Sequence, residues 1–280
     1  MATAQHDLEK DYDGLLGLLA SMVQAQSGRQ IEDGHAWMND RQTLAKKLAY
    51  HLRTIQSLRA GDTFDIDGAQ SRFIDHGSIT VLARAVVENV IVFAHVFGDP
   101  DLEASRFNHM AWKFGGVMDR QKRQAITEAA RQTQEQERPH AEALLAEIKG
   151  HRSFQAFSKG KQKKIAQGGW SGGRQWQELA VDAGFNQRYF RTVYSYLCDY
   201  SHASYAAAMQ VGQADTLEVQ SEMSRSIIGV MDLCMARFIA PYAELFESAK
   251  EILEGSEAKL VASKWNLGSR NFEPIYGAEA

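Results

Sequence analysis

Residues 79–97 form the most apolar stretch of the chain, yet they carry two opposite charges, Arg84 and Glu88, one helical turn apart. Small and branched apolar residues surround the pair, so a helix here is expected to be buried on almost every side. Buried charges cost several kcal/mol unless they are paired and hydrogen-bonded. The segment therefore predicts a core helix whose charged pair meets polar side chains of another helix. The charges, with Asn89 and His95, argue against a membrane span, and we predict no membrane partner.

A second stretch, residues 190–208 (FRTVYSYLCDYSHASYAAA), supplies the expected polar side chains. They recur at spacings of three and four, which places them on one side of a helix: Arg191, Tyr194, Cys198 and His202. We expect the whole stretch to be a single helix. The two helices together predict one polar centre: Arg84, Glu88, Tyr194 and His202.

The polar centre offers candidates for two kinds of role. The candidates for catalysis are Arg84, Glu88 and His202, because an arginine steadies phosphate charge and a histidine moves a proton near neutral pH. The candidates for ligand binding are Tyr194, Cys198 and Asp199. The alternative is a purely structural network, in which His202 is hydrogen-bonded to Glu88 or Tyr194 and Cys198 is an inert thiol. Exposure of the group to solvent decides between the two interpretations.

The fold class follows from the spacing of apolar residues and the scarcity of proline. Only four prolines occur in 280 residues, and no stretch alternates long enough to predict a strand. We predict an all-α fold, a helical bundle of about seven to eight helices, forming one domain over residues 1–255. A polar helical segment near 117–150 is expected to project from it, and residues 256–280 to form an irregular tail.

Local signals divide the predicted bundle. Residues 60–70 (AGDTFDIDGAQ) lack two ligand positions of a calcium loop and predict a turn before a helix over 71–97. The pair Gly115-Gly116 predicts a helix break, and Pro139 predicts a kink or division of the polar helix around it. The last long helix is expected over residues 215–253.

Charge and cysteine content limit the classes of function. The formal net charge of −4 gives no general attraction to nucleic acid, although a local basic patch can supply one. The two cysteines, Cys198 and Cys234, are too few for a disulfide framework or a zinc set, and the polar N-terminus lacks signal-peptide features. Asp199-x-x-His202 resembles half of a carboxylate-bridged metal site without a good second half. We therefore predict a cytoplasmic protein without metal or cofactor.

The stretch 150–173 (GHRSFQAFSKGKQKKIAQGGWSGG) contains no acidic residue. Its lysines are candidates for binding a nucleic-acid backbone: Lys161, Lys163 and Lys164. Phe157 and Trp170 stand among them and could stack on bases. The alternative is an ordinary, partly mobile surface connector, which we expect here.

Residues 175–194 (QWQELAVDAGFNQRYFRTVY) fit the spacing of a helix-turn-helix, with Gly184 at the turn. In this interpretation Arg188, with Gln187 and Arg191, contacts DNA. The pattern is degenerate, and the second helix continues past the usual length of a recognition helix.

Arg84-x-x-x-Glu88, followed far downstream by Tyr194 and by Leu197-Cys198-Asp199-Tyr200-Ser201-His202, resembles a helical family of unknown function from bacteria and archaea. That family pairs a Leu-x-Arg-x-x-x-Glu helix with a Tyr-x-x-Leu-Ser-x-x-x-His helix, and Cys198 stands where its serine is expected. The family is distantly similar to HEPN-type bundles, which implies RNA cleavage and phage defence. The HEPN signature, an arginine followed by histidine after four to six residues, has no clear copy on the second helix.

Three functions therefore stay open. The first is a defence or regulatory helical module built on the polar centre. The second is a HEPN-like nuclease acting on RNA, and the third is a DNA-binding regulator. The expected partners are nucleic acid, another protein or a second copy of the chain.

Overall fold

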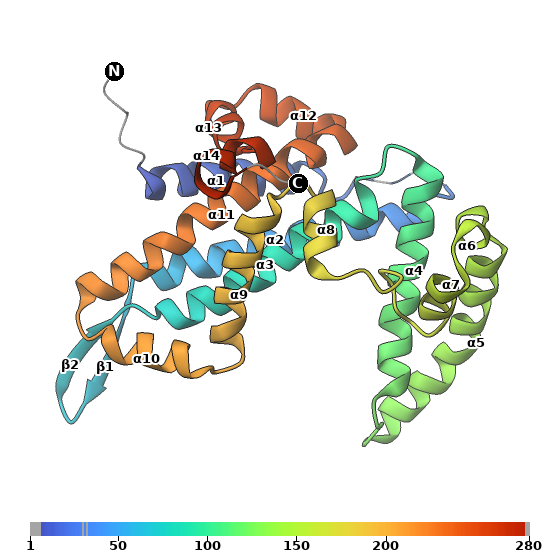
Figure 1. Cartoon of the computed structure of the whole chain (residues 1–280), viewed down its shortest axis with the longest axis horizontal. Helices are drawn as coiled ribbons and strands as arrows, with labels where there is room; N and C mark the ends of the chain where they lie inside the picture. The colour runs from blue at the N-terminus through green and yellow to red at the C-terminus, as the bar shows by residue number, and fades with distance from the viewer. Residues whose placement is uncertain (1–6, 30, 32, 278–280) are drawn as a thin grey trace. The chain divides into compact units, whose positions relative to one another are not determined.

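A computed structural model describes residues 7–29, 31 and 33–277, and it is mainly all-α, as predicted. The described residues form helices α1 to α14 and one small β-hairpin (Figure 1). The helices outnumber the expected seven to eight because short capped helices replace several predicted loops. Contacts group the chain into two units: the first holds residues up to Val92 and from Gly184, and the second is Phe93–Ala183. Each unit is described by itself.

The first unit is built around three long helices. These are α1 (Leu8–Ala25), α2 (Asn39–Arg59) and α11 (Leu217–Leu245), with a short 3-10 turn at Ala36–Met38 before α2. Helix α1 packs against α2 and α11, and also against α12 (Glu247–Glu254) and α13 (Ala258–Trp265). The largest fully buried side chains include Tyr12, Leu52 and Tyr242, and the Tyr12 hydroxyl donates to the Leu52 carbonyl at 2.6 Å. These apolar stripes supply most of the core that holds the unit together.

A β-hairpin stands where a turn and the start of a helix were expected. Strand β1 (Asp62–Ile66) pairs antiparallel with β2 (Ala69–Phe73), in the register Thr63↔Arg72. Asp67 and Gly68 form the two-residue turn with φ of 54° and 82°, which Asp-Gly adopts readily. Most of the strand side chains are exposed, so no alternating pattern marks them in the sequence. Helix α3 consequently begins at His76 and runs to Phe97.

The second unit is a helical hairpin with short helices packed on it. Helix α4 (Leu102–Lys122) packs against α5 (Glu128–Gly150), followed by α6 (Arg152–Ala156), α7 (Lys159–Ala166) and α8 (Trp176–Asp182) (Figure 1). Its core includes these residues: Phe107, Met110, Phe114, Leu144, Ile148, Phe154 and Ile165.

The helix break predicted at Gly115-Gly116 is wrong, because both glycines lie inside α4. Pro139 does not divide the polar helix, since α5 is continuous over Glu128–Gly150. The acid-free stretch 150–173, expected to be a connector, contains the helices α6 and α7. Phe154 and Ile165 are buried in the core of the second unit and hold these helices against it.

The predicted single helix over residues 190–208 is also wrong, because it is two helices. Helix α9 (Gln187–Ser201) ends at His202, and α10 (Tyr205–Gln213) begins after Ser204. Ala203 has a φ of 50°, and the Ser204 N–H donates to the Asp199 carbonyl at 3.0 Å, which is a Schellman-type helix end. Ser204 then caps α10 by accepting from the Ala207 N–H at 3.2 Å.

The C-terminal stretch expected to be irregular is partly helical. It holds α13, a 3-10 turn at Ser269–Phe272 and the short α14 (Glu273–Tyr276), while the predicted helix over 215–253 is divided between α11 and α12. The Trp265 indole N–H donates to the Asp11 carboxylate at 2.9 Å, and Phe272 stacks on Tyr189 at 4.4 Å between ring centroids. Trp265 and Phe272 therefore attach the C-terminal stretch to α1 and α9 of the same unit.

Two helices, α3 and α11, are long and apolar enough to cross a membrane by length and composition. In their most apolar windows, 56% and 67% of the residues are buried inside the protein. Core helices of soluble proteins meet the same criterion, so this is weak evidence for a membrane protein.

Replacing Asn186 by alanine is expected to lower the free energy of unfolding by about 2 kcal/mol. Asn186 is fully buried, accepts from the Tyr189 N–H at 3.0 Å at the start of α9, and donates to the Ser269 hydroxyl at 3.1 Å. Urea unfolding measures the loss. Thr127→Ala, at the exposed cap of α5, is the control and is expected to cost less, so equal losses would contradict the bridging role of Asn186.

Candidate functional site

The polar centre lies where α3 and α9 run along each other in opposite directions. Glu88 of α3 meets Tyr194 of α9, and at the start of α3, about three turns before Glu88, the His76 ring packs edge-on against Tyr200 at 6.0 Å between ring centroids. The four-residue spacing of Arg84 and Glu88 places both on the same face of α3. The pairing of these two segments, expected from the sequence, is therefore present.

The hydrogen bonds converge on one carboxylate oxygen. Arg84 Nε donates to Glu88 Oε1 at 2.9 Å, and the Tyr194 hydroxyl donates to the same oxygen at 2.7 Å. The Arg84 guanidinium also lies over the Tyr194 ring, 5.6 Å from its centroid. Glu88 and Tyr194 thereby fix the direction of the arginine.

His202 joins this group from the end of α9. Its Nε2 atom lies 3.3 Å from Arg84 Nη1. Because a guanidinium only donates, a hydrogen bond at this contact makes Nε2 the acceptor and leaves the imidazole neutral with its proton on Nδ1. The sequence led us to expect His202 on Glu88 or Tyr194, and its contact is with Arg84 instead.

The centre is reachable by solvent. The side chains of Arg84 and Glu88 are 24% and 28% exposed, and His202 is exposed. Val81 on the same helix is 42% exposed, so the expected burial of α3 on almost every side is wrong. The group is therefore not a sealed structural network, and the guanidinium has further N–H groups for a ligand.

The electrostatics of the centre keep its donors protonated. Burial lowers the pKa of Arg84, but the hydrogen bonds to Glu88 and Tyr194 outweigh it, and the net direction is upward. Burial is the main cause that raises the pKa of Tyr194, with the Glu88 charge adding to it. At neutral pH the arginine stays a cation and the tyrosine stays a neutral donor.

Two of the predicted ligand-binding residues lie in the last turn of α9. Cys198 and Asp199 are half-buried, and Cys198 is a free thiol. Their backbone carbonyls accept the N–H groups of His202 and Ser204, each at 3.0 Å. Their backbones therefore help end the helix at the point where His202 is presented.

The predicted nucleic-acid-binding residues fall into two different units. Lys161, Lys163 and Lys164 lie on α7 of the second unit, and Arg188 lies exposed on α9 of the first. The Lys161 Nζ atom lies 3.5 Å from the Phe157 ring centroid, and burial, with Arg174, lowers the pKa of this lysine. Arg188 donates to the Tyr276 carbonyl. The two helices of the predicted helix-turn-helix, α8 and α9, are divided between the units as well.

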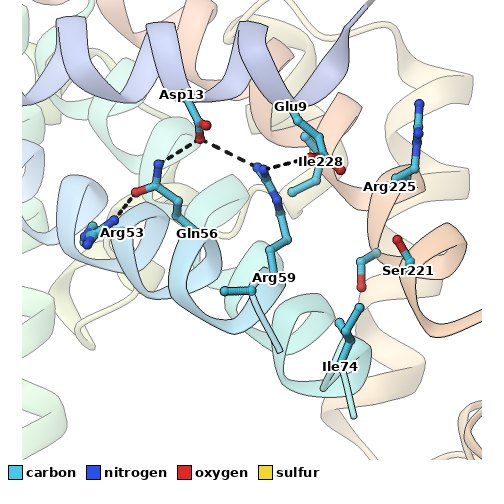
Figure 2. A pocket seen from close by; sticks show the side chains of 11 residues that line it. Glu9, Asp13, Arg53, Gln56, Arg59, Ile74, Ser221, Arg225 and Ile228 are labelled. Carbon is cyan, nitrogen blue, oxygen red and sulfur yellow. Dashed lines mark hydrogen bonds and ion pairs between the residues drawn. The ribbon is translucent and has the colours of Figure 1, made fainter. Parts of the chain in front are cut away.

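A pocket of about 390 Å³ that the sequence did not signal lies in the first unit (Figure 2). Its central residue, Arg59, forms ion pairs with Glu9 at 3.5 Å and Asp13 at 3.9 Å, while Gln56 donates to Asp13 at 2.7 Å. The arginine is thus neutralised by acids of its own unit. We interpret this pocket as a structural ion-pair network that ties α1 to α2.

Metal ligands do not gather in the part of the chain that the structure describes: it holds no group of three or more His, Cys, Asp or Glu placed to bind an ion. Asp199 and His202, half of a possible metal motif in the sequence, are separated by the helix end, since His202 lies outside α9.

The fold and the site together define a mainly all-α protein with a solvent-reachable centre of arginine, glutamate, tyrosine and histidine. The chain belongs to the family of unknown function DUF5677, which matches residues 48–218 and so spans all four residues of the centre. Neither a curated protein nor a solved structure matches the chain.

Proposed function

We propose that the polar centre binds a phosphate of RNA and that the protein cleaves RNA there, as a HEPN-like nuclease. The observation that carries the proposal is the contact at 3.3 Å between Arg84 Nη1 and His202 Nε2, where Arg84 is partly exposed and His202 is exposed. An arginine and a histidine at this distance can contact the same phosphate and the hydroxyl beside it.

The chemistry is a transfer within the RNA strand. When the phosphate takes over the Nη groups of Arg84, His202 Nε2 is released from its contact with Arg84. Nε2 then takes the proton of a ribose 2′-hydroxyl, and the 2′-oxygen attacks the adjacent phosphorus. The bond from phosphorus to the 5′-oxygen breaks, and that oxygen takes a proton from water. The hydroxide formed takes back the proton held by His202, and a 2′,3′-cyclic phosphate remains. Arg84 stabilises the negative charge that grows on the non-bridging oxygens. The step uses only atoms of RNA, His202, Arg84 and water.

Glu88 and Tyr194 act as positioning residues in this proposal. Glu88 accepts from Nε of Arg84, and Tyr194 donates to Glu88 and lies with its ring against the guanidinium. The Nη groups, which face His202, are the donors that would meet the phosphate. The free thiols Cys198 and Cys234 suit a reducing cytoplasm, which we propose as the location.

A second candidate is a defence or regulatory module that binds an anionic ligand without cleaving it. The observation that favours it is the position of His202 at a hydrogen-bonded helix end, where its backbone already has a structural role. The two candidates differ in whether a covalent bond is broken. A DNA-binding regulator is the third candidate, because Arg188 and Arg191 are exposed on α9.

His202→Ala is expected to lower the rate of RNA cleavage by about 10²- to 10⁴-fold, the usual contribution of a general base. The assay compares single-stranded RNA with DNA of the same sequence, at two salt concentrations. The protein should cut RNA only, and the variant should unfold at nearly the same urea concentration because the side chain is exposed. His140→Ala, also exposed, is the matched control. Binding of RNA without any cleavage by the wild type would favour the second candidate.

A further inference from the structure

A second pocket lies in the second unit, far along the sequence from the polar centre. Its volume is about 380 Å³, within the range of about 300–1,000 Å³ typical of ligand sites. It is formed by one face of α4 and by the glycine-rich turn that precedes α8. The lining is as follows: Trp112, Lys113, Gly116, Val117, Asp119, Arg120 and Trp170.

Two indole rings from different elements give this pocket its aromatic character. Trp112 of α4 and Trp170 of the turn both line it, and both are only partly buried. The Trp170 ring is supported from within the unit by His95 at 5.5 Å and Trp176 at 6.1 Å between centroids. A supported but accessible indole is the kind of surface on which a nucleobase stacks.

The two glycines that looked like a helix break shape the pocket. A Cβ at Gly115 would lie 2.9 Å from the Gly168 carbonyl oxygen and 3.1 Å from Trp170 Cβ, so this glycine lets the turn pack closely on α4. A Cβ at Gly116 would meet nothing within 4 Å, and Gly116 lines the pocket. Gly116 therefore keeps the space beside Trp112 open.

Basic side chains line the pocket and lie near it. Lys113 and Arg120 line it, and both are exposed. Lys122 donates to the Gln167 carbonyl at 3.3 Å, and the side chain of Lys164 packs against Gly173 at the other end of the turn. Acids partly balance them, since Asp119 pairs with Lys122 and Glu137 with Arg120.

Burial keeps the histidine behind Trp170 neutral. Burial, with smaller contributions from Arg174 and Lys161, lowers the pKa of His95 to about 4. His95 therefore stays neutral near physiological pH and adds an uncharged ring behind Trp170.

We propose that this pocket binds an unpaired base of a single-stranded RNA, with the base stacked on Trp112 and Trp170 and its phosphates on Lys113 and Arg120. The proposal rests on the function proposed above and names its substrate class: a flexible strand rather than a duplex. A duplex base is already stacked within its helix and cannot enter the pocket.

The test blocks the pocket without touching the polar centre. Gly116→Leu fills the open space, and Gly17→Leu, at another helical glycine whose Cβ meets nothing within 4 Å, is the matched control. The probe is a fluorescent 2′-O-methyl RNA strand, which lacks the 2′-hydroxyl needed for cleavage. Anisotropy should show Gly116→Leu binding about tenfold to a hundredfold more weakly than the wild type, the range expected for losing one stacked base. Gly17→Leu should bind as the wild type does.

Four results would overturn the proposal. The first is equal binding by Gly116→Leu and the wild type, and the second is equal binding of the strand and its duplex. The third is binding of a mononucleotide as tightly as the strand, which would indicate a free nucleotide pocket. The fourth is loss of binding in Gly116→Leu without a matching loss in a second variant, Trp112→Leu. Because the probe cannot be cut, binding that depends on the pocket would stand even if the cleavage assay with His202→Ala failed.

Discussion

Replacing Asp232 by asparagine is expected to raise the free energy of unfolding at pH 8 by roughly 2–4 kcal/mol. Asp232 of α11 is fully buried, and neither of its carboxylate oxygens has a hydrogen-bond partner within the described residues. Burial, with the nearby charge of Asp11, raises its pKa to about 8. An aspartate in the unfolded chain has a pKa of about 3.9.

The sign of the pH dependence follows from these two values. Below about pH 4 Asp232 is protonated in both the folded and the unfolded state, so its ionisation does not change the free energy of unfolding. Between about pH 4 and pH 8 only the folded state holds it, and stability falls as the pH rises. The asparagine variant lacks this contribution.

Urea unfolding at pH 5 and pH 8 measures the effect. The wild type should lose stability between the two values, and Asp232→Asn should lose less. Asp215→Asn, at an exposed position, should retain the wild-type difference. Equal losses in the wild type and Asp232→Asn would show that Asp232 is not protonated in the folded protein.

The second large effect is expected at the arginine of the polar centre. Arg84→Ala should lower kcat/KM for RNA cleavage by about 10²- to 10³-fold, the usual result of removing one preorganised donor to a growing oxyanion. Arg84→Lys keeps the positive charge but loses the guanidinium group that donates to Glu88 and faces His202. This variant should therefore have a kcat/KM between those of Arg84→Ala and the wild type. Initial rates on a short RNA measure both.

The stability of these variants separates a role in catalysis from a role in folding. The Arg84 side chain is partly exposed, so its loss should cost about 1 kcal/mol or less. Arg270→Ala, at an exposed position of the same unit, should change neither rate nor stability. If the cleavage rate of Arg84→Ala falls only in proportion to the fraction of the protein that is folded, Arg84 has a structural role and not a catalytic one.

The pairing of α3 with α9 could be predicted because charged side chains in an apolar helix are costly to bury without polar partners. Arg84 and Glu88 stand in an apolar helix and require polar partners, and the stretch around Tyr194 carried a matching polar seam. The all-α class followed as well, from the period of the apolar residues.

The exposure of the site could not be predicted in the same way. The apolar neighbours of Arg84 indicate a buried helix, but Val81 is exposed and Arg84 and Glu88 are only half-buried. A sequence does not state which side of a helix is covered. The helix end at His202 was missed because Ala203 takes a left-handed conformation that alanine rarely adopts. Ser204, a residue that favours helix starts, was the available signal.

The Trp112 pocket was missed for a different reason. Gly115-Gly116 looked like a break, since glycine weakens a helix, yet each glycine has a packing reason that only the neighbouring turn reveals. The hairpin at Asp62–Phe73 was missed because most side chains of its two strands are exposed, so the strands carry no alternation of apolar and polar residues. The pair Asp67-Gly68, which favours a hairpin turn, was the available signal.

The most direct test of the proposed function uses a DNA strand that contains a single ribonucleotide. If His202 activates a 2′-hydroxyl beside a phosphate held by Arg84, the protein should cut only on the 3′ side of that ribose and leave a 2′,3′-cyclic phosphate. His202→Ala should leave the strand intact. Cleavage elsewhere, a different end group, or equal cleavage by His202→Ala would contradict the assignment of the polar centre as the site of RNA cleavage.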